Sequence, residues 1–151
     1  MNHGTNDGVS AMEKVKKGVE LIVTTENRTG ITADVTDLIA EHGVNIENIC
    51  LYTVGDRAYF HILSDNNGQA RKALEGRGFS IEEREVIVLE LWNRPGMLSK
   101  AAIRFKQEGI DLFTLYGTTS PGGERTTIVF KAEDNGKAAE IFDALVLEDF
   151  D

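Results

Sequence analysis

The hydrophobic positions of this chain follow two spacings in turn, and the order of the spacings occurs twice. A β-branched apolar run at residues 19–24 predicts a strand. From Ile31 onward, apolar residues recur at i, i+4, i+7 and i+8, which predicts an amphipathic helix that ends at Gly43. The same order returns as an apolar run at residues 86–92 and a helical pattern that ends at Gly109. An internal repeat of this kind predicts two copies of one structural unit.

Two short motifs mark corresponding points of the repeats. A loop of the form Asn-Arg-Xaa-Gly follows each apolar run, and its second copy lies 66 positions after the first. Another motif joins the end of each predicted helix to the next predicted strand. The loops are Asn27-Arg28-Thr29-Gly30 and Asn93-Arg94-Pro95-Gly96, and the helix ends are Gly43-Val44-Asn45-Ile46 and Gly109-Ile110-Asp111-Leu112.

The remainder of the first repeat predicts a hairpin, a second helix and a final strand. Strands are expected at residues 45–54 and 57–64, a helix at 68–75 and a fourth strand at 79–82. Within the strand at 45–54 Ile46 is out of phase with Ile49 and Leu51, which predicts a β-bulge near residues 47–48.

The second repeat has the same elements up to its last helix. Strands are expected at residues 111–118 and 125–131, followed by a helix with Ile141, Phe142 and Leu145 facing the sheet. After that helix, residues 146–151 leave room for no more than a stub of the eighth strand.

Each repeat therefore reads β-α-β-β-α-β, and the fold class is α+β. We expect two ferredoxin-like units, each an antiparallel sheet with helices on one face. Residues 1–18 are expected to be a partly disordered lead-in with a short helix at 9–17, residues 19–85 the first domain and residues 86–151 the second. Units this small bury only about 60% of their unfolded surface, so we expect them to self-associate.

The strand-loop-helix junction has the chemistry of a small-molecule site. Such a junction offers unpaired backbone N–H groups, which suit a carboxylate, and Gly30 and Gly96 let a ligand approach the backbone. The side-chain amides of Asn27 and Asn93 suit an ammonium and a carboxylate together. Asn45 and Asp111 open the adjacent strands, so we expect them at the same edge of the sheet as the loops. Ordinary turn formation explains the same residues, and the residues alone leave both interpretations open.

The order of elements, the Asn-Arg-Xaa-Gly loop, the helix ending in Gly-Val-Asn-Ile and the repeat length resemble the ACT domain family. Members of this family are regulatory modules that most often bind amino acids at interfaces between paired domains. The resemblance covers residues 19–151 and implies a tandem ACT protein without a catalytic domain. It implies ligand contacts from Asn27, Arg28, Thr29, Gly30, Ile31 and Asn45, and from Asn93, Arg94, Pro95, Gly96, Met97 and Asp111. Asp111 stands where the first repeat has an amide, which predicts that the two sites differ in preference or that one of them is silent.

Composition excludes several other functions. The net charge of −9 repels nucleic-acid phosphates. No apolar run approaches the ~18 residues of a membrane span, and the N-terminus lacks a hydrophobic signal core, so we expect a cytoplasmic protein. Cys50 is the single cysteine and is expected to be a buried thiol. The histidines, including His42 and His61, are too scattered for a metal site, and no phosphate loop is present, so we expect neither metal nor cofactor.

These patterns favour a non-enzymatic regulatory or sensor protein that binds an amino acid or a similar small zwitterion. We expect it to form a homo-oligomer and to act through domain pairing or through affinity for a partner such as a regulated enzyme. The alternative is a protein-protein interaction module with vestigial pockets that serves as a regulatory subunit. A third hypothesis, an acylphosphatase-like enzyme of the same fold, would place Arg28 and Asn45 around a phosphate.

Overall fold

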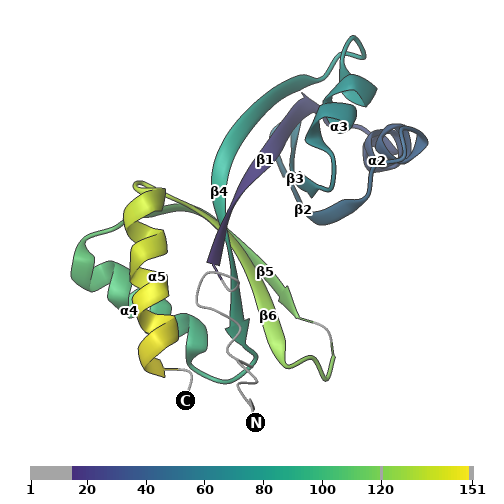
Figure 1. Ribbon diagram of the computed structural model, residues 1–151. Helices are drawn as coiled ribbons and strands as arrows, with labels where there is room; N and C mark the ends of the chain where they lie inside the picture. The colour runs from purple at the N-terminus through teal and green to yellow at the C-terminus, as the bar shows by residue number, and fades with distance from the viewer. Residues whose placement is uncertain (1–14, 120, 150–151) are drawn as a thin grey trace. The chain divides into compact units, whose positions relative to one another are not determined.

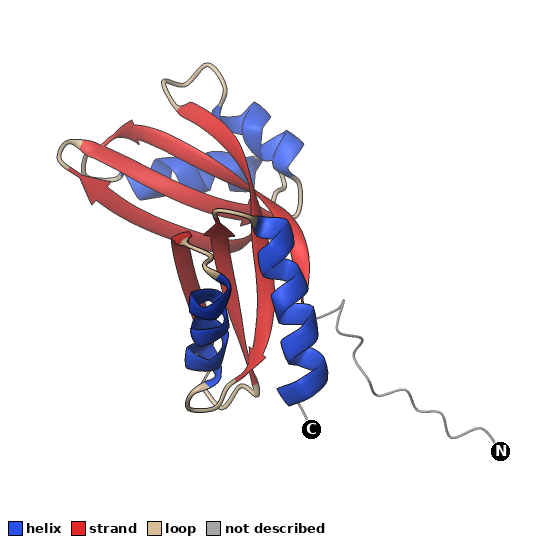
Figure 2. Cartoon of the chain, turned by 90° about the vertical axis from the view of Figure 1, so that its left-hand side faces the viewer, coloured by secondary structure: helices blue, strands red, loops and turns tan. Residues whose placement is uncertain are grey.

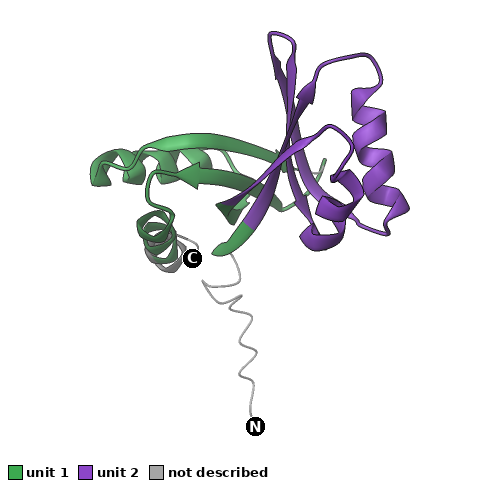
Figure 3. Cartoon of the chain, turned by 90° about the horizontal axis from the view of Figure 1, so that it is seen from above, with its two compact units in different colours: residues 1–18, 85–151 green, residues 19–84 purple. Residues whose placement is uncertain are grey.

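The computed structural model describes residues 15–119 and 121–149, and the chain divides into two compact units (Figure 3). Unit 2 is Val19–Arg84 and holds the first repeat. Unit 1 combines Met1–Gly18 with Glu85–Asp151 and holds the second repeat. One unit is therefore continuous in sequence and the other is not.

The elements follow the order that the repeat predicts, and the fold is α+β with the β-α-β-β-α-β pattern used twice (Figure 1). The strand order is β2-β3-β1-β4-β6-β5. The strands are β1 (Val15–Glu26), β2 (Ile46–Val54), β3 (Arg57–Ser64), β4 (Ser80–Trp92), β5 (Leu112–Thr119) and β6 (Arg125–Ala132). The helices are α2 (Ile31–Glu41), α3 (Asn67–Leu74), α4 (Met97–Glu108) and α5 (Asn135–Asp149).

In unit 2, α2 and α3 cover one face of the sheet, as the apolar stripes predict (Figure 2). Val23 of β1 pairs with Phe60 of β3, and both are fully buried against the helices. From α2 the buried side chains are Ile31, Val35 and Ile39. Burial of a side chain of this size contributes about 1.5–3 kcal/mol. The predicted bulge is confirmed, because the β2–β3 register shifts between Ile46 and Asn48.

The core of unit 1 is built around three aromatic rings. Phe105 of α4, Phe130 of β6 and Phe142 of α5 are all buried. Phe105 meets Phe142 edge-on at 4.8 Å between ring centroids and Phe130 at 5.6 Å. Aromatic pairs in this arrangement add about 0.5–1.5 kcal/mol to the burial of their area. The side chain of Leu145, predicted to face the sheet, lies outside the described residues.

Two predictions near the ends of the chain are wrong. The helix expected at residues 9–17 is replaced from Val15 onward by β1, which runs through Gly18 without a break. The last helix, expected to end before residue 146, continues as α5 to Asp149, and the described residues there form no strand, which is within the expected limit of a stub. Val15 is 8% exposed and packs in the core of unit 1, where the start of β1 stands beside β4 in place of the missing eighth strand. The expectations for residues 1–14 and 150–151 lie outside the described residues.

The two strands expected at residues 79–82 and 86–92 are one strand, β4. Its apolar residues from Val86 to Leu89 are buried, and its earlier part belongs to unit 2. Among the described helices, none combines the length and the apolar composition that a membrane crossing requires.

Candidate functional site

The two Asn-Arg-Xaa-Gly loops have the same backbone geometry. Gly30 and Gly96 adopt φ angles of 88° and 86°, in the left-handed region that glycine occupies without strain. Each glycine is the N-cap of the helix that follows, and its carbonyl accepts the first helical bond, from Asp34 at 3.0 Å or from Lys100 at 2.9 Å. The glycine thus turns the chain directly from the loop into the helix.

The helices that follow these loops lack side-chain caps, unlike the other two described helices. No side chain caps α2 or α4. By contrast, Asn66 Oδ1 accepts from Gln69 N at 3.1 Å at the start of α3, and Asp134 Oδ1 accepts from Lys137 N at 3.0 Å at the start of α5. A capping side chain satisfies one of the orphan N–H groups of a first turn. The first N–H of each of these helices donates within the loop, from Ile31 N to Arg28 O at 3.2 Å and from Met97 N to Arg94 O at 3.4 Å. The N–H groups that a side-chain cap would bind are therefore left for an anion.

Both loops are fixed to the β-hairpin of their own unit, but their asparagines are used differently. Asn27 N donates to Asp56 O at 2.7 Å, and Asn93 N donates to Glu124 O at 2.8 Å. Asn93 also donates from Nδ2 to Gly123 O at 2.9 Å, so part of its amide holds the hairpin. The side-chain oxygen of Asn93 is then the atom that remains for a ligand.

Asn45 does not lie at the same edge of the sheet as Asn27, and this prediction is wrong. The end of β1 at Glu26 is in register with Arg57, which pairs with Val54 at the end of β2. Asn45 precedes the other end of β2, and a strand of 9 residues spans roughly 30 Å. The reason is that α2 carries the chain back across the sheet before β2 begins.

Asp111 of unit 1 has the same displaced position, since it precedes β5 while its loop follows β4. Its carboxylate accepts from Leu112 N at 3.0 Å, and its carbonyl accepts from Glu133 N at 2.9 Å. Asp111 therefore does not set the charge beside the loop of its own unit.

The remaining predicted residues fall into two groups. Asn27, Arg28, Thr29 and Gly30 are exposed on one loop, and Asn93, Arg94, Pro95 and Gly96 are exposed on the other. Ile31 is buried in the core of unit 2, and Met97 packs partly against the core of unit 1. These last two side chains pack into the cores behind the loops. They were expected to bound a ligand pocket.

A groove in unit 2 brings Asn45 together with acidic residues of α2. The cavity has a volume of about 590 Å³ between α2 and the start of β2. Asp34 and Asp37 line it along with Asn45, together with five further residues: Ala33, Thr36, Ala40, Val44 and Ile46. The Asp34 carboxylate is paired with Arg28, so the Asp37 carboxylate and the Asn45 amide oxygen are the groups that suit an ammonium group. Within unit 2 the loop and the Asn45 end of the groove thus form two half-sites, and the other end of the groove reaches Asp34 beside the loop.

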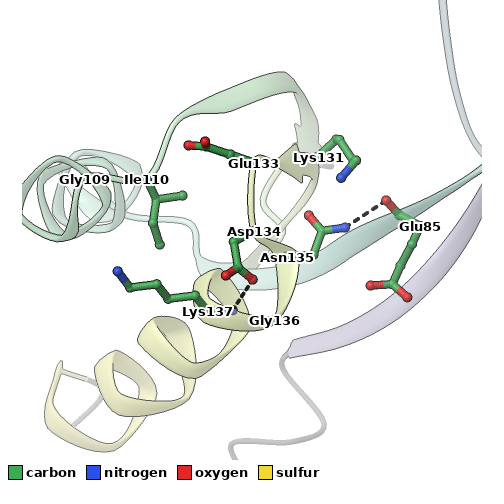
Figure 4. Close-up of a pocket in the computed structure, with 9 residues that line it drawn as sticks. All are labelled: Glu85, Gly109, Ile110, Lys131, Glu133, Asp134, Asn135, Gly136 and Lys137. Atoms are coloured by element: carbon green, nitrogen blue, oxygen red, sulfur yellow. Dashed lines mark hydrogen bonds between the residues drawn. The ribbon is translucent and has the colours of Figure 1, made fainter.

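A second cavity, of about 790 Å³, lies at the junction of β6 and α5 in unit 1 (Figure 4). Asn135 donates from Nδ2 to Glu85 O at 2.9 Å and accepts at Oδ1 from Ala132 N at 2.8 Å. Asn67 occupies the same place in unit 2 and donates to Val19 O at 2.8 Å. In both repeats this asparagine clamps the start of its helix to the first strand of the repeat by a side-chain hydrogen bond. We therefore assign it a structural role.

One buried polar cluster was missed by the sequence interpretation. His61, expected to be an ordinary strand residue, is 3% exposed and lies with Nδ1 2.7 Å from Oε1 of Glu20, which is fully buried. His61 Nε2 lies 3.2 Å from the Tyr52 hydroxyl. The available signal was Glu20 itself, an acid within the apolar run at residues 19–24.

Cys50 pairs with His61 across β2 and β3 and is partly buried. Burial, and secondarily the charge of Glu20, raise the pKa of the Cys50 thiol above its usual value. A thiol that stays protonated at neutral pH is a poor nucleophile. Among the described residues there is no group of three or more side chains arranged to hold a metal ion.

Residues 17–149 match the family model described as an ACT domain pair. This chain belongs to the ACT domain family. The match takes in both repeats. No curated protein matches the sequence.

Solved structures show the same ACT fold at low sequence identity. Protein BT0572 from Bacteroides thetaiotaomicron is 21% identical, with a TM-score of 0.78, over 87% of this chain and 90% of that chain. The regulatory subunit of aspartate kinase from Thermus flavus is 18% identical, with a TM-score of 0.63, over 91% and 95%. The ligand-free regulatory subunit of aspartate kinase from Thermus thermophilus is 17% identical, with a TM-score of 0.64, over 89% and 97%.

Proposed function

We propose that this ACT protein is a non-enzymatic regulatory protein that binds an amino acid through the backbone of its glycine loops. The contrast in helix capping carries the proposal. The chain caps α3 and α5 with Asn66 and Asp134 but leaves α2 and α4 uncapped. An uncapped helix start behind a left-handed glycine is a ready site for a carboxylate.

A second copy of the chain would complete the site. The loop and Asn45 of unit 2 lie at opposite ends of β2, and a single small ligand cannot reach both. If the β2 edges of two copies pair antiparallel, the Asn45 end of one lies beside the loop of the other. The edge strands also expose apolar side chains: Ile49 and Leu51 on β2, and Phe113 and Leu115 on β5. Exposed apolar edge strands favour pairing with another chain.

The two half-sites suit the two ends of a zwitterion. The uncapped first turn of α2 would receive the α-carboxylate. The Asn45 end of the groove of the second copy, with Asp37 and Asn45, would receive the ammonium group. Ligand and assembly are then coupled, because each ligand contacts both copies.

Similar structures favour one effect of ligand binding, the regulation of an enzyme. Similar structures include regulatory subunits of aspartate kinase from two Thermus species. We propose that this protein likewise acts in the cytoplasm on a partner enzyme, with the amino acid as the signal. The exposed β2 and β5 edges are the surfaces offered for that assembly.

A thermal-shift screen of the full chain against the twenty amino acids tests the proposal. A ligand at 100 times its Kd stabilises the folded state by about 2.7 kcal/mol. If no amino acid raises Tm at millimolar concentration, the amino-acid assignment fails.

The decisive variant is Gly30→Ala, with Gly76→Ala as its matched control. Both glycines have positive φ, 88° and 72°, and no atom lies closer than 4.0 Å to an added Cβ, so the backbone strain is comparable. Gly30→Ala is expected to weaken binding, whereas Gly76→Ala is expected to leave it unchanged. Size-exclusion chromatography distinguishes the interaction-module alternative, which predicts assembly without any amino-acid effect.

A further inference from the structure

The loop of unit 1 stands next to two arginines that share one indole ring. Trp92 at the end of β4 is in register with Arg125 at the start of β6. Arg125 Cζ lies 3.7 Å from the Trp92 ring centroid, and Arg94 Cζ lies 5.0 Å from it. The bonds of Asn93 to the hairpin at Gly123 and Glu124 hold the loop against this cluster. Two guanidinium groups therefore lie over one indole ring at the start of the loop that leads into α4.

These arginines have no carboxylate partner among the residues that the structure describes. None of the described salt bridges includes Arg94 or Arg125. The carboxylates nearest in sequence, Glu90 and Glu124, are exposed. Arg125 Nη1 is buried and has no hydrogen-bond partner. A buried donor without an acceptor and two neighbouring cations both raise the free energy, and an anion between them would lower it.

Unit 2 has acids at the corresponding positions. Arg28, the counterpart of Arg94, forms a salt bridge with Asp34. Arg57, the counterpart of Arg125, is in register with Glu26. In unit 1 the places of the two acids are taken by Lys100 and Trp92. The loop of the second repeat thus lies among basic and aromatic side chains, whereas acidic side chains accompany the arginines of the first repeat.

We infer that the loop of unit 1 binds an amino acid with an acidic side chain. One carboxylate lies on the N–H groups of the first turn of α4, and the second lies on the guanidinium groups of Arg94 and Arg125. Arginine presents a planar fork that matches a carboxylate with two parallel hydrogen bonds, and stacking on Trp92 fixes the orientation of that fork. This specificity rests on the proposed function, since it assigns the ligand class of one of its two sites.

Trp92 gives the experiment a local signal, because it is the single tryptophan of the chain. Glutamate and aspartate are titrated against glutamine and asparagine, with both Trp92 emission and calorimetry recorded on the full chain. The acids are expected to bind at least about tenfold more tightly than their amides and to change Trp92 emission.

Arg125→Gln is the test variant, and Arg57→Gln is its counterpart in unit 2. Arg125→Gln is expected to weaken glutamate or aspartate binding by about tenfold to a hundredfold and to abolish the emission change. Arg57→Gln is expected to leave both unchanged. Arg94→Gln and Arg125→Lys provide the same test if Arg125→Gln fails to fold, and each is expected to show a smaller loss in the same direction.

Three results would overturn the inference while leaving the proposed function intact. They are equal binding of acids and amides, an acid preference that survives in the arginine variants, and inorganic phosphate binding as tightly as glutamate or aspartate. Failure of every amino acid to bind at either site would instead remove the proposed function itself.

Discussion

His61 and Glu20 are bonded to each other in the interior of unit 2, with Nδ1 and Oε1 2.7 Å apart. Tyr52 extends the cluster, since its ring stacks on His61 at 5.4 Å between centroids and its hydroxyl lies 3.2 Å from Nε2. The cluster joins β1, β2 and β3 through polar side chains. Buried polar groups of this kind are costly to separate, because each loses the partner that replaced water.

Glu20→Ala is therefore expected to lower the free energy of unfolding by about 3–5 kcal/mol, because it leaves His61 without its acceptor. Glu20→Gln keeps an oxygen at that place and is expected to cost less. Glu83→Ala is the surface control: it removes the exposed Arg71–Glu83 pair at 3.3 Å and is expected to cost less than about 1 kcal/mol. Urea unfolding measures all three, and equal costs for Glu20→Ala and Glu83→Ala would contradict the prediction.

The reactivity of Cys50 is expected to depend on pH in a defined direction. Burial, followed by the charge of Glu20, raises the pKa of the Cys50 thiol in the folded state. At any pH near the usual thiol range, the folded chain then holds less thiolate than the unfolded chain. Alkylation at pH 8 should be slower in native protein than in denaturant, and Glu20→Gln should shift its onset to lower pH. Equal rates in native and denatured protein would refute this.

The N-terminal strand makes a prediction about unit 1. Val15→Asp places a charge in the core that contains Leu89 and Phe142, and it is expected to cost more than about 2 kcal/mol. Hydrogen exchange should rise in β4 and β6, while β2 and β3 keep their protection. Val54→Asp, at a position 61% exposed, is the control and should have little effect. Loss of protection confined to β2 and β3 would show that Val15 belongs to the other core.

The two asparagine clamps allow a graded comparison. Asn135 is buried and bonds both Glu85 and Ala132, whereas Asn67 is half-buried. Asn135→Ala is expected to destabilise the protein by about 2–3 kcal/mol and Asn67→Ala by about 1–2 kcal/mol, because burial decides the cost of an unsatisfied group. Thermal unfolding of the two variants provides the measurement, and the reverse order would count against a clamp role.

The sequence predicted features that depend on neighbouring residues. The stripe at Ile31, Val35 and Ile39, the left-handed glycine at position 30 and the bulge after Ile46 all follow from local spacing. Val15 was misassigned because its partners in unit 1, from Ile87 to Phe142, are distant in sequence, and a local pattern does not reveal them.

The candidate site was predicted in its loops and misjudged in its geometry. Asn45 was expected beside Asn27 because both flank strands, but the direction of α2 places them at opposite ends of the sheet. Arg125 was overlooked because its link to the loop is a cross-strand register with Trp92, which sequence order does not show. The positions of both residues relative to the loops follow from the pairing of strands.

The split origin of unit 1 has a consequence for how the protein is made. Ribosomes release the chain from its N-terminus, so Val19–Arg84 is available to fold while Glu85–Asp151 is still being synthesised. During that interval the residues that bury Val15 are not yet synthesised, and the first residues of β1 cannot yet pair with β4. Long-range pairing of this kind slows folding. The order of synthesis thus lets unit 2 fold before the core of unit 1 can be completed.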